Sequence, residues 1–384
     1  MIKFDLINPT HIAFGEGSIA ELSRLVPQDA KVLLLYGGGS IMRNGVHDQV
    51  RKALGNRAVT EFGGVEVNPH YETLLRAAAT ARDADSDYVL GVGGGSVIDA
   101  AKFLAYLVTA EGDDPWDDLK AKRFPQHILP VGAVLTLPAT GSESNPVSVI
   151  TSVKRHLKYP FSNPAARPAI AIMDPSTMAS LDRRQLGNGV VDAVTHVLEQ
   201  YATTSTNTPV QMGYSETLLE VLFEWGPKLL EENTPEAREN VMWAANQALN
   251  GLIAAGVTED WSTHYIGHAL GALYDIDHAR TLTPLMPAVF RYKLRDKQQM
   301  LARYARRVWK VSEPDDAKAA DRAVALTEDF FRRMGLPVTT SELAPVVISA
   351  DDVVEHIAAL GQMPLGEGRD IGPGEVRAIL RLAR

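Results

Sequence analysis

The sequence predicts an α/β domain with a mostly parallel sheet, followed by an all-helical domain. Over roughly the first 180 residues, short apolar runs alternate with helical patterns, as in folds that layer helices on a parallel sheet. From about Leu181 the strand-like runs disappear, and long helical patterns follow one another. Pro175 and Gly187 bracket a linker-like segment between the two parts. We therefore expect one domain over residues 1–180 and a second over residues 181–384.

The individual elements follow from apolar periodicity. Buried strands are expected at 31–36 (KVLLLY), at 87–92 (DYVLGV), within 127–138 and at 168–174. Helices are expected between them, for example at 71–85 and 96–110. In the second domain, helical patterns cover 188–204, 210–232, 236–255, 260–273, 297–310, 316–334 and 350–361.

Composition narrows the class of protein. The 384 residues are 45% hydrophobic and 22% charged, which is typical of a globular protein with a large core. The net charge of −9 and the lack of a Lys/Arg-rich block speak against nucleic acid or an anionic membrane as partner. No signal peptide and no uncharged apolar run of about 18 residues is seen, so we expect a cytoplasmic protein. Because the chain has no cysteine, any metal must be bound by histidines and carboxylates.

Two glycine-rich loops predict a dinucleotide site. YGGGS (36–40) and GVGGGSVID (91–99) each follow a strand-like run, and the second opens a helix. Glycines let backbone N–H groups approach a phosphate closely, and a helix N-terminus favours the negative charge. Two ordinary strand-to-helix turns remain the alternative interpretation. A hydroxyl-rich loop, TLPATGSESNP (136–146), also follows a strand; it would suit the nicotinamide or a phosphate, or Ser142 or Ser144 could simply cap a helix.

The first glycine loop also bears on which dinucleotide binds. A carboxylate at this place commonly holds the free ribose hydroxyls of NAD, and it would repel the 2′-phosphate of NADP. No acid occurs in the loop, which therefore favours NADP. The residues concerned are Gly37, Gly38, Gly39, Ser40 and Arg43.

Four of the ten histidines group in a way that indicates a metal site. His196 stands four residues after Asp192 in DAVTHVLEQY, so the two share a helix face. His264, His268 and His278 fall within the one segment WSTHYIGHALGALYDIDHAR. Imidazole and carboxylate ligands suit Fe(II), Zn, Ni or Mn, and three or four protein ligands leave room for a substrate oxygen. Hydrogen bonds along helix faces are the structural alternative.

These motifs together resemble a known family. FGEGSIAEL, GGGSVIDAAK, TLPATGSES, DAVTHVLEQY and HYIGHALGALYDIDHA occur in this order and cover essentially the whole chain. They are similar to the iron-containing (group III) alcohol dehydrogenases, and YGGGS, MWAANQALNGLI and EDWSTHYIGH are similar to their NADPH-dependent aldehyde reductase and butanol dehydrogenase-like subgroup. The fold implied is an N-terminal dinucleotide-binding domain and a C-terminal helical, metal-binding domain, as in dehydroquinate synthase-like proteins.

The resemblance implies a role for each matching residue. Asp192, His196, His264 and His278 match the metal ligands, for Fe(II) or Zn(II), and His268 matches a histidine beside the nicotinamide and substrate. The chain departs from many relatives at the last ligand, where it has Asp-His-Ala instead of Pro-His-Gly. The remaining matches surround the cofactor, and they are Gly93, Gly94, Gly95, Ser96, Asp99, Thr136, Thr140, Ser142, Asn68, Pro69 and Lys158.

The function implied is reversible hydride transfer between NADP(H) and an aldehyde or primary alcohol. We expect the metal to polarise the carbonyl oxygen, and His268 to take part in a proton relay. An apolar pocket between the domains, with Trp243, Asn145, Val149 and Leu252 as candidate lining residues, would discriminate chain lengths weakly, so we expect a broad aldehyde range. The subgroup also implies a homodimer, with a possible contact through an edge strand near residues 1–12.

Two other functions remain open at this point. One is an NAD-dependent glycerol dehydrogenase or a dehydroquinate synthase-like lyase on the same fold, which the missing acid after KVLLLY disfavours. The other is a non-catalytic NADP-binding sensor, which predicts a lost metal site and is disfavoured because all four ligand positions are intact.

Overall fold

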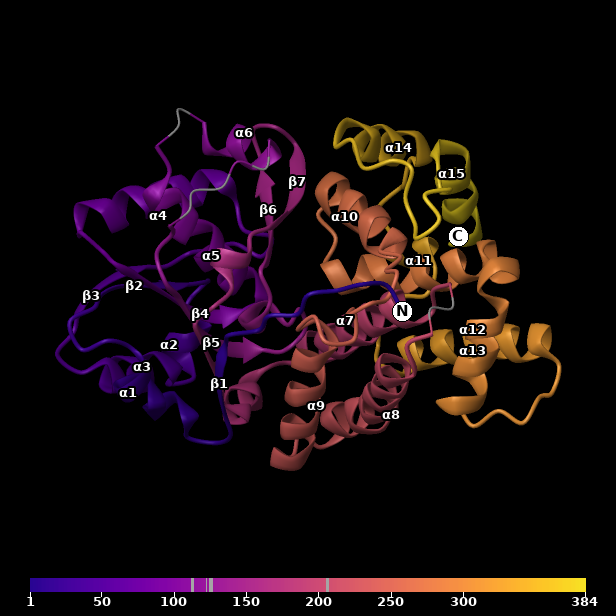
Figure 1. Ribbon diagram of the computed structural model, residues 1–384, viewed down its shortest axis with the longest axis horizontal. Helices are drawn as coiled ribbons and strands as arrows, with labels where there is room; N and C mark the ends of the chain where they lie inside the picture. The colour runs from indigo at the N-terminus through magenta and orange to yellow at the C-terminus, as the bar shows by residue number, and fades with distance from the viewer. Residues whose placement is uncertain (112–113, 122, 124–126, 205–206) are drawn as a thin grey trace. The chain divides into compact units, whose positions relative to one another are not determined.

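The computed structural model describes residues 1–111, 114–121, 123, 127–204 and 207–384. They form two compact units (Figure 1), an α/β unit of residues 8–181 and a helical unit that combines residues 182–384 with residues 1–7. The first seven residues therefore pack with the helical unit, whereas the sequence analysis assigned them to the α/β domain. Ile2, for example, donates its backbone N–H to the carbonyl of Gly256 at 3.0 Å.

The α/β unit is built on a parallel six-stranded sheet with the order β1-β8-β5-β4-β2-β3. The four predicted strands are confirmed, with bounds that fall within or beside the expected ranges. The edge strands β1 and β3 add to them. The strands are β1 (His11–Phe14), β2 (Lys31–Tyr36), β3 (Ala58–Phe62), β4 (Tyr88–Gly94), β5 (Val131–Leu137) and β8 (Ile170–Met173).

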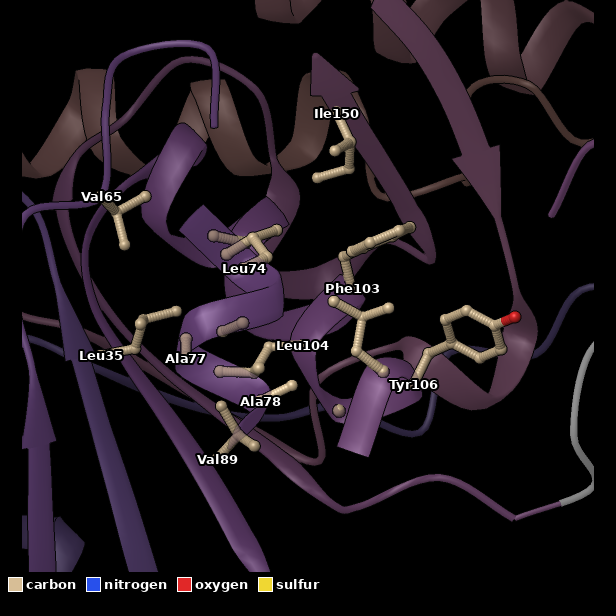
Figure 2. Close-up of a cluster of buried hydrophobic side chains, with 14 of the residues drawn as sticks. Leu35, Val65, Leu74, Ala77, Ala78, Val89, Phe103, Leu104, Tyr106 and Ile150 are labelled. Atoms are coloured by element: carbon tan, nitrogen blue, oxygen red, sulfur yellow. The ribbon is translucent and has the colours of Figure 1, made fainter. Parts of the chain in front are cut away.

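Helices cover both faces of this sheet, because its strands bury alternate side chains on opposite sides. Leu33 and Leu35 belong to a cluster with α4 and α5 (Figure 2), while Val32 and Leu34 belong to a second cluster on the other face. The two helices predicted in this unit are α4 and α5. The helices are η1 (Ser18–Glu21), α1 (Leu22–Leu25), α2 (Ser40–Arg43), α3 (Val46–Leu54), α4 (Tyr71–Asp83), α5 (Gly95–Thr109), α6 (Pro115–Lys120), η2 (Ser142–Ser144), η3 (Pro164–Ala166) and η4 (Pro175–Ser180).

An antiparallel hairpin of β6 (Val147–Ser152) and β7 (Leu157–Ser162) stands apart from the main sheet. The sequence analysis did not predict it. Val147–Ser152 buries alternate residues, and β7 contains a proline, Pro160. Apolar side chains of the hairpin, Ile150 and Phe161, join the cluster under α4 and α5.

The described residues of the helical unit form helices α7 to α15 and one 3₁₀ turn. The seven predicted helices are confirmed, although some ends shift: α9 ends at Ala248 instead of 255, and α7 begins at Arg183 instead of 188. α11 and α15 were not predicted. α11 contains Pro284 and Pro287, and proline inside a pattern normally argues against a helix. The elements are α7 (Arg183–Tyr201), α8 (Pro209–Glu231), α9 (Pro235–Ala248), α10 (Ser262–Tyr274), α11 (His278–Tyr292), α12 (Leu294–Arg307), α13 (Asp316–Arg333), η5 (Thr340–Leu343), α14 (Ala350–Ala359) and α15 (Pro373–Leu382).

None of the described helices is long and apolar enough to span a bilayer.

Candidate metal and cofactor sites

The metal candidates begin on α7, the long buried helix that opens the helical unit. Asp182 caps its N-terminus by accepting from the backbone N–H of Gln185, and Gln185 reaches back to the N–H of Asp182. Asp192 and His196 lie one turn apart in the buried middle of this helix. Nε2 of His196 is 3.7 Å from Oδ1 of Asp192, which confirms that the two side chains face the same way.

Two further histidines approach the same carboxylate oxygen from other helices. His264 lies in the first turn of α10, and its Nε2 is 3.7 Å from Oδ1 of Asp192. His278 is the first residue of α11, and its Nε2 is 3.5 Å from the same oxygen. The structure therefore brings together all four predicted ligands within the helical unit.

Their spacing fits an ion better than direct hydrogen bonds. All three nitrogen–oxygen distances exceed the range of a hydrogen bond. Donors that bind one Zn²⁺ tetrahedrally at 2.0–2.2 Å stand about 3.4 Å apart. Among the described residues, Asp192, His196 and His264 form the group of donors compact enough to hold a metal, with ligand atoms within 4.8 Å of one another. Oδ1 of Asp192 and Nε2 of His264 are also buried without a hydrogen-bond partner in the described part of the chain.

Charges at this centre act strongly on one another. Burial opposes the ionisation of Asp192, but the three histidines outweigh it and hold the pKa of this carboxyl well below its usual range. Burial likewise disfavours a charged His264, yet the carboxylates of Glu199 and Asp192 raise the pKa of this imidazole to about 9. The low pKa of Asp192 keeps its carboxylate ionised, which favours a cation, whereas the raised pKa of His264 means that a bound metal ion would displace a proton from this imidazole.

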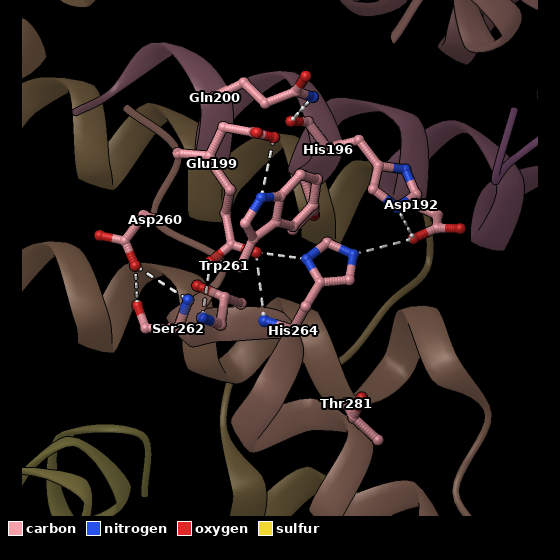
Figure 3. A network of polar contacts seen from close by, with 12 residues as sticks. Asp192, His196, Glu199, Gln200, Asp260, Trp261, Ser262, His264 and Thr281 are labelled. Atoms are coloured by element: carbon pink, nitrogen blue, oxygen red, sulfur yellow. Dashed lines mark hydrogen bonds and ion pairs between the residues drawn. The ribbon is translucent and has the colours of Figure 1, made fainter. Parts of the chain in front are cut away.

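Glu199 is a functional candidate that the sequence analysis missed. It is 2% exposed, and its carboxylate accepts a hydrogen bond from Nδ1 of His264 and from the backbone N–H of Thr263 at 2.6 Å (Figure 3). Its position offered a signal, because Glu199 stands seven residues after Asp192 and three after His196 on the same face of α7.

The start of α10 is held by a second buried polar network. Trp261 precedes the helix in the left-handed region, with φ of 62°, and Asp260 accepts from the backbone N–H of Ser262 at 2.9 Å. Lys297, itself fully buried, bonds Asp260 at 2.7 Å and Glu367 at 2.8 Å. This network fixes the turn from which His264 projects.

His268 lies one turn beyond His264 on α10, and its ring centroid is 5.1 Å from that of His278. It is partly exposed and stands outside the compact donor group. The structure therefore places it beside the candidate metal centre, and its role beside the nicotinamide and substrate stays a prediction.

The dinucleotide candidates lie in the α/β unit at the point where the strand order reverses. β2 pairs with β3 on one side and with β4 on the other, so the chain passes outward from β2 to β3 and then crosses back to the opposite side of β2 at β4. Ligands of open α/β sheets bind at the carboxyl ends of such strands. Both glycine loops are found there, since Gly37–Gly39 follow β2 and Gly93–Ser96 join β4 to α5.

The glycines of the second loop are needed for close packing. A Cβ on Gly95 would stand 2.3 Å from Oγ1 of Thr140, and a Cβ on Gly93 would stand 2.6 Å from Cγ2 of Val97. The loop between Leu137 and Ser142 can therefore lie directly against the start of α5. Among the residues that the structure describes, no side chain caps α5, which leaves its first N–H groups available to an anion.

Asp99 and Ser142, both predicted at the cofactor, form hydrogen bonds with other groups of the protein. Ser142 donates its hydroxyl to Asp99, and the other carboxylate oxygen accepts from the backbone N–H of Val149 at 2.9 Å. Beneath them lies Lys102, a fully buried lysine missed by the sequence analysis. Its Nζ donates to the carbonyls of Ser142 at 3.0 Å and Val147, and lies 3.4 Å from Asp99.

The remaining cofactor candidates lie in two places. Thr136 is buried near the end of β5, and Thr140 follows in the loop beyond it. Asn68, with φ of 60°, accepts from Nζ of Lys158 at 2.8 Å, and the carbonyl of Pro69 accepts from the N–H of Thr151. The structure thus joins the predicted adenosine-side turn to the hairpin.

Comparisons with known proteins decide the family. Residues 9–175 match the family described as iron-containing alcohol dehydrogenase, and residues 188–367 match its C-terminal domain. The chain belongs to the iron-containing alcohol dehydrogenase family. The predicted family, fold class and oxidoreductase class are therefore confirmed.

Relatives within this family match the whole chain. The NADPH-dependent aldehyde reductase YqhD of Escherichia coli is 43% identical over 387 residues, which is 100% of both chains. The probable NADH-dependent butanol dehydrogenase 1 of Bacillus subtilis is 37% identical over 99% of both. Among solved structures, E. coli YqhD has a TM-score of 0.97 and covers 100% of this chain and 99% of its own. The NADH-dependent butanol dehydrogenase A of Thermotoga maritima has a TM-score of 0.95 at 33% identity, with the same coverage.

The substrate-lining candidates of this alcohol dehydrogenase belong to different units. Trp243 and Leu252 are 43% and 40% exposed in the helical unit. Asn145 and Val149 belong to the α/β unit, where Asn145 is buried and accepts from Nζ of Lys102 at 3.2 Å and from the N–H of Val147 at 3.0 Å. A pocket lined by all four stays a prediction.

Proposed function

We propose that the protein is a metal-dependent aldehyde reductase that transfers hydride reversibly between NADP(H) and an aldehyde or primary alcohol. The observation that carries this proposal is the convergence of three imidazole nitrogens on Oδ1 of Asp192 at 3.5–3.7 Å. The 43% identity to an NADPH-dependent aldehyde reductase over the full length supports the substrate class.

Four side chains would hold the divalent ion, Fe(II) or Zn(II): Asp192, His196, His264 and His278. The set suits these ions because imidazole and carboxylate are ligands of borderline hardness, and three histidines with one carboxylate leave a position open for substrate. When bound, the ion supplies Lewis acidity toward a carbonyl oxygen, and the nicotinamide supplies the hydride. Asp192, His196 and His264 are buried, which limits the access of water to these three ligands, whereas His278 is partly exposed.

The α/β unit would bind the dinucleotide. We assign the pyrophosphate to the uncapped N-terminus of α5 with Gly93–Ser96, and the adenosine side to the turn at Asn68 and Pro69. Thr136 and Thr140 would stand near the nicotinamide half, while Asp99 and Ser142 shape the adjoining loop.

The choice of NADP over NAD rests on the first glycine loop. Relatives are named for both cofactors, so similarity alone does not decide it. Gly37–Ser40 carry no carboxylate, and Arg43 is exposed at the end of the short helix α2 that begins at Ser40. A 2′-phosphate would meet a helix N-terminus and a guanidinium there, which favours NADP.

We also propose a broad aldehyde range, a homodimer and a cytoplasmic location. β1 lies at an edge of the sheet, where its open side offers hydrogen bonds to a second copy. Apolar side chains of the N-terminal segment, among them Ile2, Phe4 and Phe14, are exposed in the single chain. Sedimentation equilibrium tests the dimer directly, and a monomer at all concentrations would contradict it.

A single assay tests the function. Purified protein is offered butanal with NADPH or NADH, before chelation, after chelation, and after refilling with Fe(II) or Zn(II). We expect NADPH oxidation that disappears on chelation and returns with one of the metals. Turnover with NADH alone would contradict the argument from Gly37–Arg43 but keep the class. No turnover with either cofactor in the metal-loaded protein would contradict the proposed function.

A further inference from the structure

We infer that Glu199 is a positioning residue that tunes the metal centre through His264. The inference rests on the metal centre of the proposed function. It concerns a carboxylate that is not one of the four ligands and that comes from the same helix as two of them. In α7, Asp192, His196 and Glu199 follow one another at spacings of four and three residues, so all three point to the same side.

The contacts of Glu199 converge on one histidine. Oε2 accepts from Nδ1 of His264 and from the backbone N–H of the same residue at 3.2 Å. Oε1 accepts from the backbone N–H of Thr263 at 2.6 Å. Figure 3 shows the imidazole of His264 between this carboxylate on one side and Asp192 on the other. Helix α7 thus places a carboxylate beside each nitrogen of the ring, Glu199 beside Nδ1 and Asp192 near Nε2.

This arrangement selects the tautomer that a ligand needs. A proton on Nδ1 is held by Glu199, so the lone pair of neutral His264 resides on Nε2, which faces Asp192 at 3.7 Å. The negative carboxylate also makes the imidazole a stronger donor, and such partners commonly change metal affinity 10- to 100-fold. His196, a second ligand, stacks on His264 with ring centroids 4.6 Å apart, so the imidazole that Glu199 holds also packs against this ring.

A purely structural role is the competing explanation, because Glu199 also caps α10. A carboxylate at a helix N-terminus stabilises the helix whether or not a metal binds. The two roles differ in their consequences. Loss of a cap lowers the stability of the helix, whereas loss of a positioning partner weakens metal binding and alters the ligand field of the bound ion.

The chain offers a matched control in Glu216. This glutamate is also buried, at 4% exposed, in the neighbouring helix α8, and it accepts from the hydroxyl of Tyr201 at 2.9 Å and from Arg303 at 2.6 Å. Within the described part of the chain, the hydrogen bonds and ion pairs of Glu216 reach Tyr201, Arg303 and Arg307 and none of the ligand histidines. Glu216→Gln therefore removes an equally buried charge from the same unit without touching the metal centre.

The test measures metal binding in the full chain. Wild type, Glu199→Gln, Glu199→Asp and Glu216→Gln are loaded with Co²⁺ as the probe ion. Affinity is obtained by competition with a chelator, the visible absorption spectrum reports the ligand field, and circular dichroism reports the fold. We expect Co²⁺ affinity to fall 10- to 100-fold in Glu199→Gln, with an altered spectrum, and to stay unchanged in Glu216→Gln. Glu199→Asp keeps the charge but is one methylene shorter, so it should also weaken binding; it provides the readout if the glutamine variant does not fold.

The outcomes separate this inference from the function on which it rests. Wild-type affinity and spectrum in a folded Glu199 variant would overturn the positioning role and leave the proposed function standing. An equal loss of affinity in Glu216→Gln would also overturn it, because any buried charge would then have the same effect. A wild-type protein that binds no Co²⁺ would overturn the metal-dependent function and the inference together.

Discussion

The buried lysine beneath the cofactor loops gives the sharpest prediction. Lys102→Met keeps an unbranched apolar stem that is one atom shorter and removes the charge and the donors. In the structure, Nζ of Lys102 donates to the carbonyls of Ser142 and Asn145, at 3.0 and 3.3 Å, and to Val147. Its counter-charge is Asp99, 3.4 Å away. Burial lowers the pKa of Lys102 to about 8, and Asp99 opposes that shift.

The expected cost follows from what the methionine leaves behind. Asp99 would remain as a buried carboxylate with its two hydrogen bonds but without a cation, and three carbonyl groups would lose a donor. Breaking one partner of a buried pair typically costs about 3–5 kcal/mol. Adding Asp99→Asn removes the orphaned charge, because an amide can still accept from Val149 and donate to Ser142. We therefore expect the double variant to recover part of the loss.

Three measurements check this. Hydrogen–deuterium exchange should rise at 95–110 and 140–150 in Lys102→Met, because those segments lose their common anchor, and urea should unfold the α/β unit at a lower concentration. KM for NADPH should rise more than kcat falls. Lys297→Met, a buried lysine of the helical unit, is the control that should leave exchange at 140–150 unchanged. Wild-type exchange and stability in Lys102→Met would refute the reasoning.

Three further predictions follow from single contacts. Gly95→Ala should weaken NADPH binding at least tenfold with the metal still bound, since its Cβ would stand 2.3 Å from Oγ1 of Thr140; equal KM values would contradict the packing argument. His268→Ala should flatten the pH dependence of kcat while metal content stays at the wild-type level, and an unchanged pH–rate profile would count against the proton relay. Burial lowers the pKa of His356, so the unfolded chain takes up this proton at a higher pH than the folded chain. Stability should therefore fall as the pH drops through about 6.5, and urea unfolding of His356→Gln should show a shallower fall.

Local patterns were enough to place the candidate metal ligands but not the residues that support them. The pair Asp192 and His196 could be placed on one face of a helix because their spacing of four fixes it. The buried strands could be found because both of their faces are covered, which leaves a continuous apolar run such as KVLLLY. Residue spacing did not predict α11, because Pro284 and Pro287 interrupt the pattern of a helix. The helix forms nevertheless, in packed surroundings.

The partners that hold the sites are distant in sequence, and this explains why they were missed. Glu199 meets His264 across 65 positions, and Lys102 meets Ser142 across 40. Nothing local distinguishes Lys102 from a solvated charge, and the one local sign for Glu199 is its spacing after Asp192 and His196; the burial of both depends on how separate elements pack. Asp99 shows that a motif match can also miss such distant partners. A motif match assigns it to the cofactor, yet both of its carboxylate oxygens bind the loop at Ser142 and Val149. A contribution of Asp99 to NADPH binding would therefore have to act at least partly through the shape of that loop, and Asp99→Asn should then change KM for NADPH less than Lys102→Met does.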